Sequence, residues 1–120
     1  MPASVAIELP PFDTGQYEGC ELTLAQGNAL LTIRVTGLSP LAIRFSRVRW
    51  HQLTALPNCT EEMVADAYFR VVEYPNSAAV ADFIRQDRAS RTAYTTLSHY
   101  RIFLDETGCH EVFAESAAAL

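Results

Sequence analysis

Apolar and polar residues alternate most clearly between residues 19 and 35, on both sides of Gly27-Asn28. Glycine followed by asparagine is typical of the two-residue turn of a β-hairpin. With this loop, one face of the hairpin is apolar and the other carries hydroxyl groups and opposite charges, and a slip by one residue would mix the two. The sequence therefore predicts an antiparallel hairpin. The predicted cross-strand pairs are Gln26 with Ala29, Leu24 with Leu31, Leu22 with Ile33, Cys20 with Val35, Thr23 with Thr32, and Glu21 with Arg34.

A second hairpin is predicted over residues 98–115, with its turn between Asp105 and Cys109. A three-residue loop fits if Gly108 takes the left-handed conformation that glycine adopts easily. One face of this hairpin is then a core face, and the other is a mixed surface that a helix, another strand layer or a partner should cover. The predicted pairs are Asp105 with Cys109, Phe103 with Glu111, Ile102 with Val112, Arg101 with Phe113, Tyr100 with Ala114, and His99 with Glu115.

Residues 41–53 predict a long strand whose apolar positions change parity at Ser46-Arg47. A β-bulge at this point would restore a single apolar face. The simpler interpretation is that the bulge bends the sheet, and the alternative is that it re-aims side chains at a functional site. The core face would hold Ile43, Phe45, Val48 and Trp50. The outer face would hold Arg44, Arg49 and His51.

One main α-helix is predicted over residues 78–89, after a cap at Asn76 or Ser77. Its apolar residues recur at helical spacing and form one stripe. A second, short helical turn is expected over residues 60–66, with Thr60 as its cap. The stripe consists of Val80, Phe83, Ile84 and the aliphatic stem of Arg88.

Short strands are also expected at residues 4–9 and 67–74, whereas residues 117–120 are expected to fray. The pattern predicts one domain, residues 1–120, of the α+β class. Its core would be a curved antiparallel sheet of about five to seven strands built from hairpins, with the helix of residues 78–89 packed on it.

Composition and charge exclude several classes of function. The net charge is −5 and all nine basic residues are arginine. We expect no nucleic-acid partner, because phosphate contacts need clustered basic charge. No apolar run approaches the roughly 20 residues of a membrane span, and no secretory signal pattern is present, so we expect a cytoplasmic protein without a membrane partner. Three widely spaced cysteines fit reduced thiols, and no cofactor motif occurs.

The reactive residues of the second hairpin do not converge in its predicted register. His99 lies far from Cys109 and His110, which point to opposite faces, so we expect no metal site. Ser98, His99 and Asp105 likewise form no catalytic triad, and no catalytic residue is assigned. Cys109, beside His110, is the best candidate for a reactive thiol, although an ordinary buried cysteine is the favoured interpretation.

A basic cluster beside Trp50 is the best candidate for a binding surface. It could contact an acidic partner or a phosphate, and the simpler interpretation is a solvated strand face balanced by acids on neighbouring strands. The outer face of the second hairpin adds to this surface. The candidate ligand or partner surface consists of Arg44, Arg49, Trp50, His51, His99, Arg101, Phe103 and Phe113.

The run from Ser98 to Glu115, with the Asn76-Ser77 cap and helix ahead of it, resembles the C-terminal hairpin of small bacterial β-rich proteins. Some of these resemble immunity proteins, which neutralise toxins made by the same or neighbouring cells. The resemblance covers only the last part of the chain and consists of turns and apolar positions. It implies a non-enzymatic protein that acts by binding another protein, and it implies no functional residue.

The leading hypothesis is a small cytoplasmic bacterial protein that acts by protein–protein binding, with an immunity-type inhibitor of a toxin as one form of it. One alternative is a small-molecule-binding or enzymatic domain with a pocket between sheet and helix. A further alternative is a structural homodimer formed through an exposed strand edge. The residues expected to line such a pocket are Trp50, His51, Tyr68, Tyr100 and Arg101.

Overall fold

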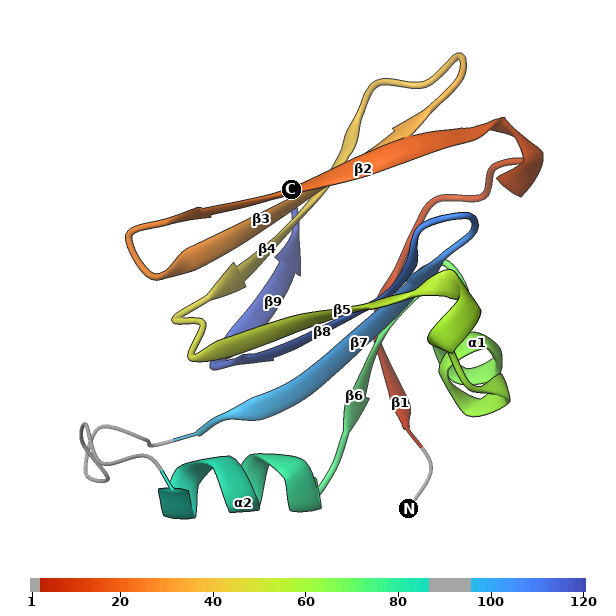
Figure 1. The fold of residues 1–120 in the computed structure, drawn as a ribbon. Coiled ribbons are helices and arrows are strands. Elements are labelled where there is room, and N and C mark those ends of the chain that lie inside the picture. Colours follow the sequence, from red (N-terminus) through yellow and green to blue (C-terminus); the bar gives the residue numbers. More distant parts are fainter. Residues whose placement is uncertain (1–2, 87–95) are drawn as a thin grey trace.

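Two antiparallel sheets lie face to face, and two helices cover one of them (Figure 1). The computed structural model describes residues 3–86 and 96–120. The predicted α+β class is confirmed. The strands are β1 (Ser4–Glu8), β2 (Tyr17–Ala25), β3 (Asn28–Val35), β4 (Leu41–Ser46), β5 (Trp50–Ala55), β6 (Arg70–Tyr74), β7 (Ser98–Leu104), β8 (Gly108–Ala114) and β9 (Ser116–Ala119). The helices are α1 (Glu61–Ala67) and α2 (Ala78–Gln86), with 3₁₀ turns η1 (Thr14–Gln16) and η2 (Leu56–Asn58).

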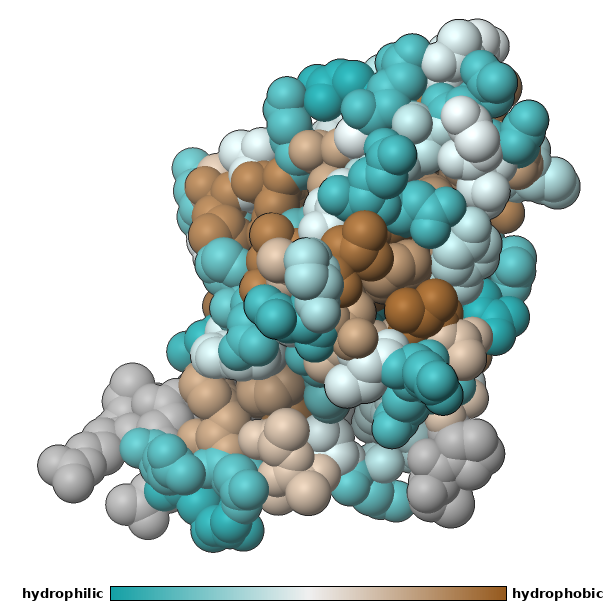
Figure 2. Space-filling model, turned by 45° about the vertical axis from the view of Figure 1, so that its right-hand side comes forward, coloured by the Kyte–Doolittle hydropathy of each residue, from teal (hydrophilic) through white to brown (hydrophobic). Residues whose placement is uncertain are grey.

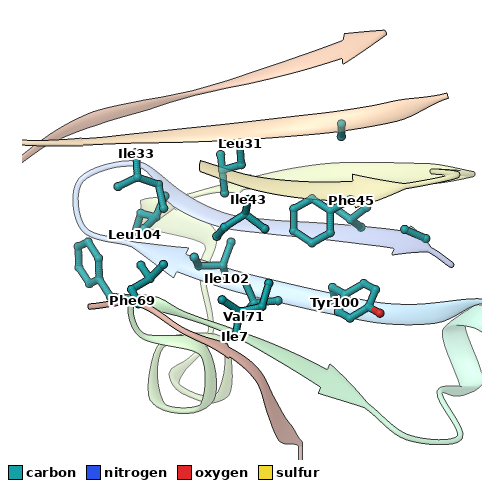
Figure 3. Close-up of a cluster of buried hydrophobic side chains, with 14 of the residues drawn as sticks. Ile7, Leu31, Ile33, Ile43, Phe45, Phe69, Val71, Tyr100, Ile102 and Leu104 are labelled. Atoms are coloured by element: carbon teal, nitrogen blue, oxygen red, sulfur yellow. The ribbon is translucent and has the colours of Figure 1, made fainter. Parts of the chain in front are cut away.

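The strands are divided between two sheets, where the sequence predicted a single curved one. The five-stranded sheet has the order β1-β6-β7-β8-β5, and the four-stranded sheet has the order β2-β3-β4-β9. Each sheet turns an apolar face toward the other, and packing these two faces together buries both. The second face of the five-stranded sheet also carries buried apolar side chains, among them Val72 and Phe103. The core between the sheets is drawn in Figure 3. Its largest fully buried side chains include Leu31, Ile33, Ile43 and Phe45 from one sheet and Val71, Ile102, Leu104 and Val112 from the other.

The parity change at Ser46-Arg47 is a crossing between the sheets and not a bulge within one strand. β4 ends at Ser46 in the four-stranded sheet, and β5 begins at Trp50 in the five-stranded sheet. Arg47 has a φ of 55°, a left-handed conformation that redirects the chain. Each strand therefore keeps its own apolar parity, and Arg44 lies in a different sheet from Trp50.

Both predicted hairpins form, with registers that differ by two residues from the prediction. In the first, Gln26 (φ 53°) and Gly27 (φ 81°) are left-handed and make the turn, so the loop begins one residue before the predicted Gly27-Asn28. An even shift leaves every side chain on its predicted face, because side chains alternate with period two. The ion pair between Glu21 and Arg34 therefore still forms, diagonally, at 3.0 Å.

The closing hairpin turns through Asp105–Thr107, with Glu106 left-handed at a φ of 63°. Gly108 is required for another reason than the predicted one. The backbone of β5 passes so close that a Cβ on Gly108 would lie 2.1 Å from the carbonyl oxygen of Thr54. The predicted core face is confirmed. It consists of Tyr100, Ile102, Val112 and Ala114, with Leu104 added.

Both helices cover the outer face of the five-stranded sheet (Figure 1). Thr60 caps α1 as predicted, and its hydroxyl accepts the backbone N–H of Met63 at 3.3 Å. In the predicted main helix, residues 87–89 lie outside the described part of the chain. Neither described helix is long and apolar enough to cross a lipid bilayer. The predicted stripe faces the sheet, with Val80 buried and Phe83 and Ile84 half-buried.

Residues 116–119 form β9, where the sequence predicted a frayed tail. β9 pairs with β4, although it follows directly on β8 of the other sheet. Glu115 makes the transition. Its backbone N–H donates to Ser46 O at 2.9 Å, and its carboxylate pairs with Arg47 Nε at 2.7 Å. β9 therefore joins the two sheets at this end of the molecule.

Candidate functional site

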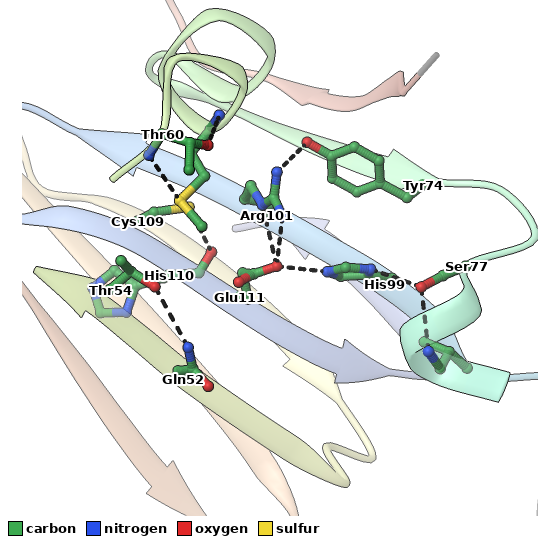
Figure 4. A network of polar contacts seen from close by, with 12 residues as sticks. Gln52, Thr54, Thr60, Tyr74, Ser77, His99, Arg101, Cys109, His110 and Glu111 are labelled. Carbon is green, nitrogen blue, oxygen red and sulfur yellow. Dashed lines mark hydrogen bonds and ion pairs between the residues drawn. The ribbon is translucent and has the colours of Figure 1, made fainter. Parts of the chain in front are cut away.

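The outer face of the five-stranded sheet holds a buried polar network beside helix α2 (Figure 4). Glu111 on β8 lies opposite Arg101 on β7. Its Oε1 accepts hydrogen bonds from Arg101 Nε at 3.2 Å and Nη2 at 2.9 Å, and from His99 Nε2 at 2.8 Å. The side chains of Glu111 and Arg101 are only 10% and 12% exposed. Charges at this depth need such hydrogen bonds, because an unpaired buried charge is strongly unfavourable.

Ser77 and Tyr74 extend this network to neighbouring elements. The Oγ of Ser77 lies 2.9 Å from Nδ1 of His99 and accepts the N–H of Val80 at 3.2 Å, which caps α2. The hydroxyl of Tyr74 accepts from Arg101 Nη1 at 2.8 Å, and the guanidinium lies 4.7 Å from the centre of the tyrosine ring. The network thus connects α2 and β6 to the central strands β7 and β8.

The network fixes the charge state of Glu111. The hydrogen bond from His99 lowers the pKa of Glu111, and Arg101 lowers it further, against the desolvation that would raise it. Burial alone would lower the pKa of Arg101, but the hydrogen bonds and charge of Glu111 raise it overall. An ionised carboxylate only accepts, so Nε2 of His99 carries a proton and, in the neutral imidazole, Nδ1 accepts the hydroxyl proton of Ser77.

A hydroxyl, an imidazole and a carboxylate in this order also form the nucleophile relay of serine hydrolases. Ser77 lies between a strand and a helix and follows Asn76, which has a φ of 53°. Two features differ from that relay. The hydroxyl faces Nδ1 of His99 and not Nε2, and it also accepts the capping hydrogen bond from Val80. The direct effect of the arrangement is to anchor α2, and activation of the hydroxyl is a second chemical use of it.

Four of the predicted surface residues lie under the helices and are not available to a partner. His99, Phe103 and Phe113 are 7%, 2% and 4% exposed. Phe113 packs edge-on against the rings of Phe83 and His99. The fourth, Arg101, is held in the polar network. The sequence analysis expected a helix, another strand layer or a partner to cover this face. In the structure, helices cover it.

Sequence reasoning missed Glu111, Tyr74 and Ser77 as members of a site. A register with the loop at Asp105–Thr107 places Arg101 opposite Glu111, and this favourable pair of charges was the available signal for Glu111. No comparable signal exists for Ser77, because only the packing of α2 brings its hydroxyl to His99.

A second candidate site lies on the open side of the sandwich, where β2 and β5 are the edge strands. A groove of about 230 Å³ lies near the tip of the β2–β3 hairpin. The connection between β4 and β5 is held to this tip by the N–H of Val48, which donates to the carbonyl oxygen of Gly27 at 2.7 Å. We call it the hairpin-tip groove. Its lining residues are Leu24, Gly27, Asn28, Val48, Arg49, Trp50 and His51.

Three predicted surface residues come together in the hairpin-tip groove, namely Arg49, Trp50 and His51. Trp50 pairs with Phe113, and its indole stacks on that ring with centres 4.3 Å apart, so the indole lies on the outer face of the five-stranded sheet. His51 pairs with Val112 and faces the other sheet. Arg44 does not join them. It is exposed on the outer face of the four-stranded sheet, because β4 and β5 belong to different sheets.

Apolar side chains remain exposed along the open side. Leu24 on β2 and Leu53 on β5 are each 51% exposed. Leu53 pairs with His110 and therefore lies on the face of its sheet that looks toward the other sheet. On the opposite side of the sandwich, β1 lies against β9. Figure 2 shows hydrophobic side chains that reach the surface across the middle of the molecule.

His110 lies between the two sheets near this open side. Its Nε2 is 3.7 Å from Sγ of Cys20, which is half-buried and packs against the core between the sheets. Burial lowers the pKa of His110 below its usual 6.5, and the charge of nearby His51 adds to this effect. His110 is therefore a neutral imidazole at pH 7.

Cys109 is not suited to nucleophilic chemistry at neutral pH. It is completely buried on the outer face, in a cluster with Ala67 and Phe103. Desolvation raises the pKa of its thiol to about 12, so the thiolate is scarcely populated. Among the described residues, no three or more His, Cys, Asp or Glu side chains lie together as metal ligands would.

The side chains expected to line a pocket between sheet and helix do not converge. Tyr100 lies in the core between the two sheets, whereas Arg101 lies on the opposite face of the same strand. Tyr68 is exposed at 41%. Trp50 and His51 line the hairpin-tip groove instead.

Comparisons with protein-family models, with curated proteins and with solved structures find no match to this chain.

Proposed function

We propose that this protein acts by binding another protein through the open side between β2 and β5. The observation that carries the proposal is the exposure of Leu24 and Leu53 beside a strand edge that the rest of the described chain leaves uncovered. Exposed apolar side chains that gather along one side of a small protein typically mark an interaction site. The hairpin-tip groove lies at one end of this side and offers a hollow for a side chain of the partner.

The residue types around the groove support the proposal. Trp50 contributes to the wall of the groove, and its indole is held in place by stacking on Phe113 on the outer face of the five-stranded sheet. Arg49 and His51 lie beside it. Tryptophan and arginine are enriched among the residues that contribute most to protein–protein binding.

The biological role that we infer within this proposal is that of an immunity-type inhibitor, which neutralises a toxin by binding it. Its support is the resemblance of the second hairpin and the helix before it to small bacterial proteins of that kind. The net charge of −5 favours a partner with a basic surface.

The test compares two leucine variants with similar exposure. Leu53→Arg places a charge on the open side, and Leu38→Arg places one at the turn after β3, where Leu38 is 46% exposed. Tagged wild type and both variants are used to capture proteins from the source cell, and captured proteins are identified by mass spectrometry. We expect one protein that wild type and Leu38→Arg retain and that Leu53→Arg loses. Equal retention by all three, or no retained protein, would contradict the proposal.

If a retained protein is toxic when expressed alone, co-expression with this chain should restore growth, and co-expression with Leu53→Arg should not. A retained protein without toxicity leaves the binding function in place and contradicts the immunity role. The co-expression experiment therefore tests the immunity role independently of protein binding.

A second candidate function is acyl transfer at Ser77, favoured by the hydrogen bonds from Ser77 through His99 to Glu111. The hydroxyl oxygen would add to an ester carbonyl while Nδ1 of His99 takes its proton. The bond from the carbonyl carbon to the alkoxy oxygen would then break, and the alcohol would leave with that proton while the acyl group stays on Ser77. A fluorophosphonate probe should then label wild type but not Ser77→Asn, which keeps a capping side chain on α2. Labelling of neither protein would contradict this candidate and leave the network with a purely structural role.

A further inference from the structure

We propose that, in the absence of its partner, the chain forms a symmetric dimer in which β5 pairs antiparallel with β5 of a second copy. This inference rests on the proposed function, because it assigns a resting occupant to the same open side. The two five-stranded sheets would become one continuous sheet, and the partner would have to displace the second copy.

The first argument compares the four edge strands of the two described sheets. An exposed strand edge pairs with other strands unless a bulge, a charge or short length prevents it. β1 has an irregular register between Val5 and Ile7 and contains Glu8. β2 has one between Tyr17 and Gly19. Its charged residues are Glu18 and Glu21, and β9 is only four residues long.

β5 lacks each of these protections. It has six residues, Trp50–Ala55, and none of them is Asp, Glu, Lys or Arg. Its pairing with β8 runs without a register shift over its whole length, so its free edge is regular as well. His51, Gln52 and Leu53 are exposed in the middle of the strand. The backbone groups along this edge are thus open to another regular strand.

The second argument identifies the occupant. A partner strand for β5 must itself have a free, regular and uncharged edge of similar length, and among the described strands β5 alone meets this condition, because β9 has only four residues. Two copies related by a two-fold axis through Gln52 keep equivalent faces on the same side, because opposite residues then share parity. His51 of one copy lies opposite Leu53 of the other, which gives Leu53 an apolar and aromatic neighbour.

The third argument concerns the four-stranded sheets. Because the axis is perpendicular to the joined sheet, both four-stranded sheets lie on the same side of it, with the two β2 edges facing each other. Leu24 of each copy would then be shielded from water. Glu21 on β2 is already paired with Arg34 at 3.0 Å, which reduces repulsion across the junction.

The mass in solution tests the proposal. Sedimentation analysis of wild type should give twice the 13.3 kDa of one chain, with dissociation on dilution. Added salt should strengthen the dimer, because each copy carries a net charge of −5. Leu53→Arg, which brings two like charges near the axis, should be a monomer, and Leu38→Arg should remain a dimer. Circular dichroism of each variant checks that it is folded.

A cysteine placed on the axis supplies a second measurement. Gln52→Cys should form a reducible cross-linked dimer under mild oxidation, because directly opposite Cβ atoms in paired strands lie about 5 Å apart. Gln86→Cys, exposed on α2, is the matched control and should not cross-link. A monomeric wild type, or a dimer in which Gln52→Cys does not cross-link, would overturn the proposal.

The two proposals fail in different ways. If the chain is monomeric while Leu53→Arg still abolishes capture of a partner, the dimer is refuted and the binding function stands. If the dimer forms and Leu53→Arg leaves capture unchanged, the dimer stands and the proposed binding surface is refuted.

Discussion

At the scale of single residues, burial decides the charge that each polar side chain of β8 carries. Glu111 on the outer face is buried with Arg101 and His99, and these partners keep its carboxylate ionised. His110, the preceding residue, is buried on the inner face, where no acidic side chain of the described residues stabilises its charged form, and desolvation keeps it neutral. Adjacent residues of one strand thus have opposite electrostatic roles because they point to opposite faces.

Replacing Glu111 by glutamine should lower the free energy of unfolding by about 3 kcal/mol, because the buried guanidinium of Arg101 would lose its counter-charge. The matched change Glu21→Gln removes an ion pair whose side chains are 62% and 44% exposed, and it should change stability by less than about 1 kcal/mol. Urea unfolding at pH 7 measures both. Similar losses for the two variants would contradict the structural role of the network.

Acidification should destabilise the protein in two steps. The pKa of His110 is lower in the folded chain than its usual 6.5, so the unfolded chain binds more protons and stability falls as the pH drops below about 6.5. Glu111 adds a second loss below its usual 4.5, because its folded pKa is also lowered. Urea midpoints measured from pH 8 to about pH 3 cover both steps. His110→Gln should remove the upper step only, and persistence of that step would assign it to another group.

At the scale of elements, turn conformation decides which residues face one another. Gln26 and Glu106 adopt left-handed conformations within the two turns. Each turn therefore begins one residue before the position predicted from its glycine. Both hairpins therefore shift by two residues and retain their faces. Gly108 is freed from the turn and serves the contact between β8 and β5, where the carbonyl of Thr54 leaves no room for a Cβ.

Two glycine-to-alanine changes distinguish the cost of an unfavourable φ from the cost of a steric clash of the added Cβ. Gly27→Ala keeps open space around its Cβ and suffers only the left-handed φ of 81°, which costs about 1 kcal/mol. Gly108→Ala has an unfavourable φ of 126° and a Cβ 2.1 Å from a backbone oxygen, so β5 must move away from β8. We expect a clearly larger loss of thermal stability for Gly108→Ala. Equal losses would show that β5 adjusts without cost.

At the scale of the whole molecule, the sandwich is closed on one side and open on the other. β1 and β9 approach each other on the closed side, and β9 connects the two sheets through Glu115. The open side between β2 and β5 keeps Leu24 and Leu53 in water. Both proposals about binding therefore concern the open side between β2 and β5.

Removal of residues 116–120 should make β4 an edge strand, because it withdraws the pairing of β9. We expect lower stability and faster amide hydrogen exchange in β4, with little change in α2, which packs against β7 of the other sheet. Hydrogen exchange followed by mass spectrometry measures this strand by strand. Unchanged protection of β4 would mean that β9 contributes nothing to the four-stranded sheet.

Local pattern was sufficient for most of the elements and for the face on which each hairpin residue lies, but not for β9 or for the break between β4 and β5. Period-two alternation survives an even change of register, so the core face of Tyr100, Ile102, Val112 and Ala114 follows from sequence. The cap at Thr60 follows in the same way, because it depends on residues three positions apart, and the cap at Ser77 is one of the two that the sequence offered. The polar network did not follow, because an error of two residues replaced the pair of Arg101 and Glu111 by mismatched neighbours.

Tertiary structure alone decided how the strands are shared between two sheets and which polar side chains meet. The crossing between the sheets depends on the left-handed backbone of Arg47. A residue other than glycine adopts this conformation only where the surrounding structure compensates the strain. The contact of Ser77 with His99 joins residues from α2 and β7, and the open side arises because β2 and β5 are both left at an edge. Alternation along the chain specifies faces, whereas the neighbours of each face depend on long-range packing that no local pattern encodes.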